Sequence, residues 1–318
     1  MNSTIDPDRA PAPRRVGFLG PVGTFTEQAM LREADLAELE AVPFPLMTDV
    51  LFALAEGEID LGVVPVENAI EGTVNATVDT MAFDVDVVIQ RELLEPVSLH
   101  LLTVPGTDVA QVRRVVSIPV ASAQCRRWLR EHLPEVEYVA AKSTAEAAEI
   151  VAKAADPTIA AVANERAAQV YGLDVGGADI EDHPENQTRF VVVARSGVPP
   201  RTGHDKTSIV VFQQADRPGS LLAILQEFAA RSINLSLLLS RPTKTSLGDY
   251  CFMLDLDGHL SDPVVADCLR TLRATQANVK FLGSYPAAGS HGPAARAQLD
   301  ASFQAADVWL EGLRSQLG

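Results

Sequence analysis

RRVGFLGPVGTFTEQAM, residues 14–30, decides the fold of this chain, because an apolar run, a polar turn and a helix-like amphipathic segment follow one another in it. The same order returns in DLGVVPVENAIEGTVNATVDTM, residues 60–81. It also returns three more times, in residues 112–133, 137–155 and 158–173. Strands that alternate with helices at this spacing predict parallel strands joined by crossover helices, and therefore an α/β sheet that is covered on both faces.

Polar side chains gather where these predicted strands end and the helices begin. In such sheets ligands bind at the carboxyl ends of the strands, and helix N-termini offer free N–H groups to anions. Each residue alone could be an ordinary helix cap, and Ser143 with Glu146 has the spacing of a capping box. Their repetition at one end of the sheet favours a binding site. The residues are Thr24, Thr26, Glu67, Asn68, Ser122, Gln124, Ser143, Thr144 and Asn164.

Composition limits the function classes. The chain has 318 residues, 47% of them hydrophobic, which is enough for two folded domains. The net charge of -16 argues against nucleic acid as a partner and requires local donors for any anionic substrate. No segment approaches the roughly 18 apolar residues of a membrane helix, and the first residues lack the apolar core of a signal peptide. We therefore expect a cytoplasmic protein with no membrane partner.

The common cofactor and metal motifs are missing from the sequence. GPVGTFTEQ, residues 20–28, lacks the GxGxxG spacing of dinucleotide-binding turns, and no phosphate loop occurs. The six histidines form no HExxH, and no GxSxG is present. The three cysteines form no CxxC, which favours buried thiols over a zinc site or disulfides. The sequence predicts neither a metal nor a cofactor.

HPENQTRFVVVAR, residues 183–195, places polar side chains directly before an apolar strand. Asn186, Gln187, Thr188 and Arg189 would lie at the start of that strand or at a hinge between two lobes. They could line a crevice, or they could satisfy backbone groups in a structural turn.

Four stretches, GPVGTFTEQA, VVPVENAIEGTVNATVD, STAEAA and NQTRFVVVAR, closely resemble the prephenate dehydratase family over residues 15–286. The resemblance implies a cofactor-independent conversion of prephenate to phenylpyruvate in phenylalanine biosynthesis. It also implies a two-lobed α/β domain, similar to periplasmic binding proteins, with the active site in the cleft. By this resemblance Thr188 of the Thr-Arg-Phe motif is the catalytic residue, supported by Glu67 and Asn68.

The chemistry of this family suits the side chains present. Prephenate loses carbon dioxide and hydroxide as its ring becomes aromatic, so a threonine hydroxyl could donate a hydrogen bond to the departing oxygen. Arg189 could pair with a substrate carboxylate or serve as a structural clamp. Family members often have Ser-His-Pro-Gln where this chain has SIPV, residues 117–120, so a role of that histidine cannot be transferred. The residues predicted to bind substrate are Thr24, Phe25, Thr26, Gln124, Ser143, Thr144, Asn186, Gln187, Arg189 and Phe190.

The sequence from Thr207 to Pro286 predicts a βαββαβ unit. We expect strands at 208–213, 234–240, 250–257 and 278–284, with helices that end near 231 and span 263–274. This unit resembles an ACT domain, which in the family pairs between subunits and binds phenylalanine as inhibitor. The predicted effector-binding residues are Asp216, Gly219, Ser220, Leu221, Leu222, Asn234, Leu235, Leu239, Ser240, Arg241 and Pro242.

Two positions of this unit depart from the family. Leu239 and Ser220 replace the glutamate and the alanine of the family motifs. The loss of the glutamate removes a partner for an ammonium group, so a domain that is kept only for dimerisation stays an alternative. We expect a homodimer or a homotetramer through the ACT domains.

The predicted organisation has five parts, and the tail ends in one amphipathic helix formed by Leu299, Phe303, Ala306, Trp309, Leu310 and Leu313. The parts are a disordered tail 1–14, a catalytic domain 15–197 whose lobes divide near 95 and 185, a linker 198–205, an ACT domain 206–286 and a spacer with the helix 287–318. Two alternatives to prephenate dehydratase remain at this point: arogenate dehydratase, and a non-catalytic amino-acid or metabolite sensor.

Overall fold

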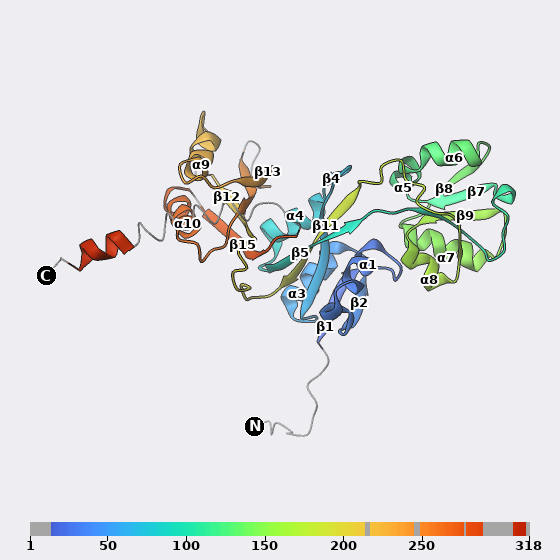
Figure 1. Cartoon of the computed structure of the whole chain (residues 1–318), viewed down its shortest axis with the longest axis horizontal. Coiled ribbons are helices and arrows are strands. Elements are labelled where there is room, and N and C mark those ends of the chain that lie inside the picture. Colours follow the sequence, from blue (N-terminus) through green and yellow to red (C-terminus); the bar gives the residue numbers. More distant parts are fainter. Residues whose placement is uncertain (1–13, 214–216, 245–248, 277, 289–307, 316–318) are drawn as a thin grey trace, which may run out of the picture. The chain divides into compact units, whose positions relative to one another are not determined.

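The computed structural model describes residues 14–213, 217–244, 249–276, 278–288 and 308–315 (Figure 1). The chain divides into two compact units, residues 1–64 with 95–186 and residues 65–94 with 187–318. Among the described residues, no helix has both the length and the apolar character needed to cross a membrane. The predicted mixture of α/β layers followed by a βαββαβ unit is confirmed.

The first unit begins with the strand, turn and helix that residues 14–30 predict. Strand β1 pairs in parallel with β2 and with the first half of β3. Thr24 caps the first helix, and its Oγ1 accepts a hydrogen bond from Glu27 N at 3.3 Å. The elements are β1 (Arg15–Leu19), α1 (Phe25–Leu31), α2 (Ala34–Ala37), β2 (Glu40–Phe44), α3 (Met47–Glu56) and β3 (Leu61–Asn68).

A second sheet in this unit has the strand order β10-β6-β9-β7-β8. Its members are β6 (His100–Thr103), β7 (Arg114–Ser117), β8 (Glu137–Ala140), β9 (Ile159–Ala163) and β10 (Asp174–Gly177). Strand β7 is parallel to β8 and β9, but β6 is antiparallel to both β9 and β10. The strands of the predicted repeats in this sheet, β7, β8 and β9, are parallel as predicted. Strand β6, which belongs to none of those repeats, runs the opposite way.

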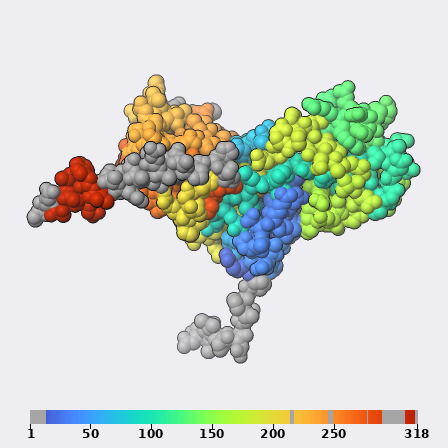
Figure 2. All heavy atoms as spheres, viewed as in Figure 1, coloured from blue at the N-terminus to red at the C-terminus, as the bar shows by residue number. Residues whose placement is uncertain are grey.

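Helices on both sides of this sheet bury its apolar side chains. The helices are η2 (Val109–Gln111), α5 (Pro119–Gln124), α6 (Arg126–His132), α7 (Thr144–Ala154) and α8 (Glu165–Tyr171). One buried cluster includes Leu101, Val115 and Leu129, and another includes Leu102, Val116 and Ala148. Because consecutive strand residues such as 115 and 116 enter different clusters, the sheet is covered on both faces, as predicted. The residues near 100 to 180, teal to yellow-green in Figure 2, form a rounded body.

The capping box predicted at α7 forms with one difference. Ser143 Oγ accepts from Glu146 N at 2.9 Å, which caps the helix. The Glu146 carboxylate accepts from Lys142 N at 2.6 Å, one residue before the cap rather than at the cap itself. The first bond satisfies an N–H group that the helix leaves unpaired, and the second fixes the residue that precedes the cap.

The second unit holds the rest of the first sheet, whose strand order is β2-β1-β3-β11-β5. Residues 69–81 begin differently from the predicted helix, because Gly72 adopts φ +79° and the chain turns back to pair with β3. The helix starts only at Asn75. The elements are β4 (Gly72–Thr73), α4 (Asn75–Asp79), the π-helical turn η1 (Thr80–Asp84), β5 (Val88–Pro96) and β11 (Gln187–Ala194).

The βαββαβ unit folds as the sequence predicts. Its four antiparallel strands have the order β13-β14-β12-β15. Helices α9 and α10 cover one face and share a buried core with the strands, which includes Ile224, Phe228, Leu254 and Leu272. The elements are β12 (Asp205–Phe212), α9 (Ser220–Ala229), β13 (Leu235–Pro242), β14 (Tyr250–Asp257), α10 (Pro263–Thr275) and β15 (Asn278–Pro286).

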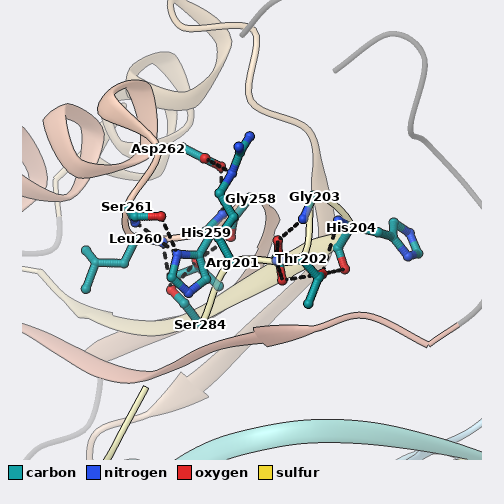
Figure 3. A network of polar contacts seen from close by, with 12 residues as sticks. Arg201, Thr202, Gly203, His204, Gly258, His259, Leu260, Ser261, Asp262 and Ser284 are labelled. Atoms are coloured by element: carbon teal, nitrogen blue, oxygen red, sulfur yellow. Dashed lines mark hydrogen bonds and ion pairs between the residues drawn. The ribbon is translucent and has the colours of Figure 1, made fainter. Parts of the chain in front are cut away.

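The segment before β12 is fastened to the loop that follows β14 (Figure 3). His259 Nε2 lies 3.0 Å from the carbonyl oxygen of Pro199, so this nitrogen carries the proton and donates. Arg201 forms an ion pair with Asp262, and the Asp205 carboxylate accepts from Gly203 N at 2.9 Å. The first two bonds attach the segment before β12 to the loop between β14 and α10, and the third holds the turn of the segment itself.

Part of the predicted tail lies outside the described residues. This holds for residues 1–13 and for Leu299, Phe303 and Ala306 of the predicted terminal helix. Residues 308–314 are helical, and their side chains, Trp309 among them, are exposed.

Candidate active site

Two dipeptides on neighbouring strands form the centre of the predicted site. Glu67 and Asn68 end β3, and Thr188 and Arg189 lie near the start of β11. Asn68 Nδ2 donates to Thr188 Oγ1 at 2.9 Å, while Arg189 Nε lies 3.4 Å from Glu67 Oε2. Successive residues of a strand point to opposite faces. Each dipeptide therefore contributes one side chain to each face of the sheet, and the pairs match across the two strands.

The hydrogen bond between Asn68 and Thr188 has a defined direction. Asn68 Oδ1 accepts from the backbone N–H groups of Ile70 and Glu71, at 3.0 Å each. This turn identifies the side-chain oxygen, so the NH₂ group is the one that faces Thr188. Thr188 Oγ1 accepts that bond, and its own proton stays available for donation to another group. Thr188 is half-buried and Asn68 is partly buried.

On the other face, Arg189 lies among carboxylates. Its Nη1 donates to Asp255 Oδ2 at 2.8 Å and to Glu92 Oε2 at 3.2 Å. Glu92 is also bound by Lys206 Nζ at 3.0 Å. The exposed fractions of the Glu92 and Asp255 side chains are 0% and 2%, against 41% for Glu67. These contacts favour the structural clamp over the substrate ligand as the role of Arg189.

Charge explains why this cluster is stable in the interior. Burial alone would lower the pKa of Arg189, but the Asp255 carboxylate, with Glu92, outweighs it and raises that pKa. Burial also raises the pKa of Tyr285 well above its ordinary value, so its hydroxyl stays protonated beside Ser208 Oγ at 2.7 Å. Arg189 and Lys206 together balance the two buried carboxylates.

The cavity beside Arg189 is too small for a substrate. It has a volume of about 10 Å³ and is lined by Glu67, Arg189, Asp255, Leu239 and Tyr285, among others. This is the space that a single water molecule occupies. The cavity on the Arg189 face of β11 therefore has no room for a substrate, and the ligand role of Thr188 on the other face stays a prediction.

Other predicted ligands line an open pocket in the first unit. Thr24 and Ser143, the caps of α1 and α7, lie there with Lys142 and Phe44 in a pocket of about 490 Å³. This volume is within the range of small-molecule sites. The Thr24 hydroxyl also donates to Leu19 O at 2.8 Å. The structure thus brings these two hydroxyls to one pocket, and their role as ligands stays a prediction.

The remaining predicted substrate residues differ in exposure. Asn186 is buried, and its Nδ2 donates to Gln124 Oε1 at 3.2 Å, which leaves its buried Oδ1 without a hydrogen bond. Gln187 is exposed. Phe25 packs against the apolar core of the second sheet. Three further side chains are buried and belong to the packing of their elements: Thr26, Thr144 and Phe190.

Sequence reasoning missed the partners of Arg189 and one buried pair of the first unit. Asp255 carries charge inside a predicted strand, which is the one signal that could have pointed to it. Glu92 and Lys206 lie outside the predicted strands. In the first unit, Arg166 binds Glu27 at 2.9 Å, and that carboxylate is 6% exposed. The described residues contain no group of three or more His, Cys, Asp or Glu side chains that could hold a metal ion.

The predicted effector residues lie on α9 and β13. Gly219 adopts φ +88° before α9, and Ser220 Oγ donates to Gln213 Oε1 at 2.6 Å. Arg241 makes a two-pronged ion pair with Asp79 of α4, at 2.7 and 2.9 Å, so its guanidinium is engaged. Leu222, Asn234, Ser240 and Pro242 are exposed, whereas Ser220, Leu221, Leu235 and Leu239 are half-buried. Asp216 lies outside the described residues.

Two protein-family models match most of the chain. Residues 16–198 match the prephenate dehydratase family model, and residues 207–274 match the ACT domain model. A prephenate dehydratase of Mycolicibacterium vanbaalenii is 43% identical, with 94% of this chain and 98% of that protein covered.

Two solved structures are also similar to this chain over most of its length. The prephenate dehydratase of Arthrobacter aurescens in complex with L-Phe superposes with a TM-score of 0.85 and 39% identity, over 95% of this chain and 99% of that one. GqqA, described as a novel type of quorum quenching acylase, reaches a TM-score of 0.77 at 27% identity, over 86% and 98%. The two family models, the relative at 43% identity and the paired Glu67-Asn68 and Thr188-Arg189 motifs together show that this chain belongs to the prephenate dehydratase family.

Proposed function

We propose that this protein is a prephenate dehydratase that needs no cofactor and converts prephenate to phenylpyruvate, carbon dioxide and water. The observation that carries the proposal is the hydrogen bond from Asn68 to Thr188, which leaves the threonine proton free for a substrate. Family membership over nearly the full chain supports the same substrate. In keeping with a biosynthetic enzyme, we assign the protein to the cytoplasm.

The reaction requires a donor for a leaving group. The bond between the ring and its carboxylate breaks, its electron pair enters the ring, and the hydroxyl leaves from the opposite carbon as the ring becomes aromatic. Thr188 donates a hydrogen bond to the departing oxygen, where negative charge develops in the transition state. A threonine hydroxyl is too weak an acid to protonate that oxygen fully near neutral pH, so its contribution is electrostatic.

Asn68 serves as a positioning residue in this mechanism. An amide NH₂ group donates but cannot remove a proton from Thr188, and the Ile70 and Glu71 N–H groups hold the amide in place. A donor that is already oriented costs little reorganisation when the charge develops. Ser143 is the proposed side-chain donor to a substrate carboxylate, because the chain carries a net charge of -16 and must bind a dianion with local donors. Thr24, whose hydroxyl donates to Leu19 O, lines the same pocket.

We further propose that L-phenylalanine binds the ACT domain and inhibits the enzyme. The Arthrobacter relative was solved with L-Phe, which supports this effector. Leu239 stands where the family has a glutamate, so the ammonium of the effector needs another acceptor here. We propose that the protein forms a homodimer or a homotetramer whose subunits contact each other through the ACT domains.

Steady-state turnover tests the function. We expect purified protein to form phenylpyruvate from prephenate, and to form little phenylalanine from arogenate, whose amino group replaces the ketone. Added phenylalanine should suppress the rate. Turnover of arogenate alone would replace the substrate assignment, and the absence of turnover on both would favour a ligand sensor. Hydrolysis of an acyl-amide substrate in the same preparation would favour the activity that the name of GqqA describes.

A further inference from the structure

The carboxylate of Asp255 joins the ACT sheet to the catalytic strand. Asp255 lies on β14 and is 2% exposed. Its Oδ2 accepts from Arg189 Nη1 at 2.8 Å, and its Oδ1 accepts from Ser208 Oγ at 2.6 Å. Ser208 Oγ is in turn 2.7 Å from the Tyr285 hydroxyl. Both oxygens of this buried acid are therefore engaged, as a buried charge requires.

The bonds that hold Arg189 also fix the backbone of its neighbour Thr188. The two residues are consecutive on β11, so the peptide unit between them is shared and their side chains point to opposite faces. A guanidinium held by Asp255 and Glu92 on one face fixes the backbone that presents the Thr188 hydroxyl on the other. Nη1 donates to both buried acids, while Nε of the same group lies 3.4 Å from Glu67. The guanidinium therefore reaches three carboxylates, which the single nitrogen of a lysine could not do from the same position.

The balance of charge shows what the loss of Asp255 would do. Arg189 and Lys206 face two buried acids, Glu92 and Asp255, and one exposed acid, Glu67. Without the Asp255 charge, Arg189 would be attracted less strongly to the buried acids, and the attraction by Glu67 would carry more weight. Because Glu67 precedes Asn68, a shift of this pair would disturb the donor that orients Thr188.

We propose that Asp255, a residue of the ACT domain, is a positioning residue of the dehydratase reaction, an inference that rests on the proposed function. The ACT domain thus contributes to catalysis in the absence of any effector. The loss of this carboxylate lowers kcat, because the transition-state donor is misplaced, and leaves KM nearly unchanged, because Asp255 does not meet the substrate.

The test compares Asp255→Asn with wild type in steady-state turnover of prephenate without phenylalanine. We expect kcat to fall by about 10- to 100-fold, the size of effect that a small misplacement of a catalytic group produces. KM should change by less than about threefold. Asp257→Asn is the matched control, since Asp257 lies on the same strand and binds Asn234 rather than Arg189. It should keep the wild-type kcat.

A double-mutant cycle separates positioning from a general loss of packing. Arg189→Lys keeps the charge but cannot contact Glu67, Glu92 and Asp255 at once, so it should also lower kcat. Adding Asp255→Asn to Arg189→Lys should then lower kcat by clearly less than it does alone, because the two residues act as a unit. Thermal unfolding of each variant establishes that the folded protein is the species assayed.

Each outcome decides one claim. A wild-type protein that does not turn over prephenate defeats the proposed function. An active wild type with an Asp255→Asn variant that melts earlier but keeps full kcat overturns the inference about Asp255 alone. If Asp255→Asn does not fold, Ser208→Ala takes its place, since it removes one hydrogen bond of Asp255 and keeps the ion pair. It should lower kcat about two- to tenfold, and an unchanged kcat would overturn the inference.

Discussion

Asn68 sets the direction of the hydrogen bond that reaches Thr188. Its oxygen is held by two backbone N–H groups and its NH₂ group faces the threonine at 2.9 Å. Thr188 is therefore an acceptor toward Asn68, and in the proposed mechanism its own proton is donated to the substrate. A hydroxyl whose oxygen already accepts one hydrogen bond has fewer orientations for its proton. In the proposed mechanism, this restriction orients the Thr188 proton for donation.

Replacement of Asn68 by aspartate should reverse this bond. A carboxylate accepts only, so Asn68→Asp would draw the Thr188 proton toward itself and away from the substrate. We expect kcat for prephenate to fall by about 100-fold or more, the cost of losing one preorganised donor. Asn68→Ala, which removes the partner without reversing the bond, should lose less. An Asn68→Asp variant with higher kcat than Asn68→Ala would contradict this direction.

The sequence identifies Thr188 and Arg189 but not what each contacts. The family motif places both residues, and strand alternation puts them on opposite faces. The partners of Arg189, however, are 97 and 66 residues away along the chain, on β5 and β14. Only the pairing of distant strands brings them together, and no local pattern records that pairing. The choice between ligand and clamp therefore had to come from the structure.

At the scale of elements, strand β15 runs unusually close to β5. A Cβ atom added at Gly283 would lie 2.7 Å from the carbonyl oxygen and 3.0 Å from the nitrogen of Ile89. Gly283 also adopts φ +144°, which side chains disfavour. Glycine is the residue that permits this approach.

Gly283→Ala should destabilise the protein by about 1–3 kcal/mol, the cost of overpacking against a backbone that cannot give way. Denaturant unfolding measures it. Gly203→Ala is the control, because Gly203 has φ +91° but no atom within 4 Å of its added Cβ. It should cost less than Gly283→Ala, and equal losses for both variants would mean that backbone conformation, not the approach of β5, sets the requirement.

The ion pair between Arg241 and Asp79 links β13 with α4 and depends on pH. Burial would raise the pKa of Asp79, but its bonds with Arg241 and Lys244 outweigh this and hold it below its ordinary value of 3.8. A carboxyl with a lowered pKa stabilises the folded state above its unfolded pKa. This contribution is lost as the pH falls through the folded pKa.

Asp79→Asn should therefore lower the free energy of unfolding by about 1–3 kcal/mol at neutral pH. The difference from wild type should shrink as the pH falls below about 4, where the carboxyl takes up its proton. Chemical denaturation across this range measures it. Asp84→Asn, at an exposed neighbouring aspartate, is the control and should leave stability unchanged. A gap between Asp79→Asn and wild type that persists in acid would contradict the assignment.

Elements with a strong local pattern agree with the sequence prediction. Strand β14 has the predicted bounds, and α10 differs by one residue, since Pro263 begins it and its apolar residues recur at helical spacing. The predictions were wrong where pairing, not local pattern, determines the structure. Residues 72–73 pair back onto β3 as a short strand, where the sequence predicts the start of a helix.

At the scale of the whole molecule, the three cysteines are buried and free, which confirms the prediction of buried thiols. Burial raises the pKa of Cys251 and of Cys268 to about 11, and raises that of Cys125 further. The thiolate is the reactive form, so little of it is present near neutral pH.

Native protein should therefore resist labelling by DTNB. We expect all three thiols to react at least about 100-fold more slowly than in denaturant, where three equivalents should be released. Rapid release of even one equivalent from the folded protein would show that one of these thiols is accessible.

The chain as a whole combines a dehydratase domain and an ACT domain, and Thr188 is the residue on which the account of its activity depends. The most direct measurement is the turnover of prephenate by wild type and by Thr188→Val, which keeps the shape of the side chain and removes its hydroxyl. We predict phenylpyruvate formation by wild type and a loss in kcat of about 100- to 1000-fold in the variant, with KM nearly unchanged. Equal kcat values for the two proteins would contradict the role of Thr188.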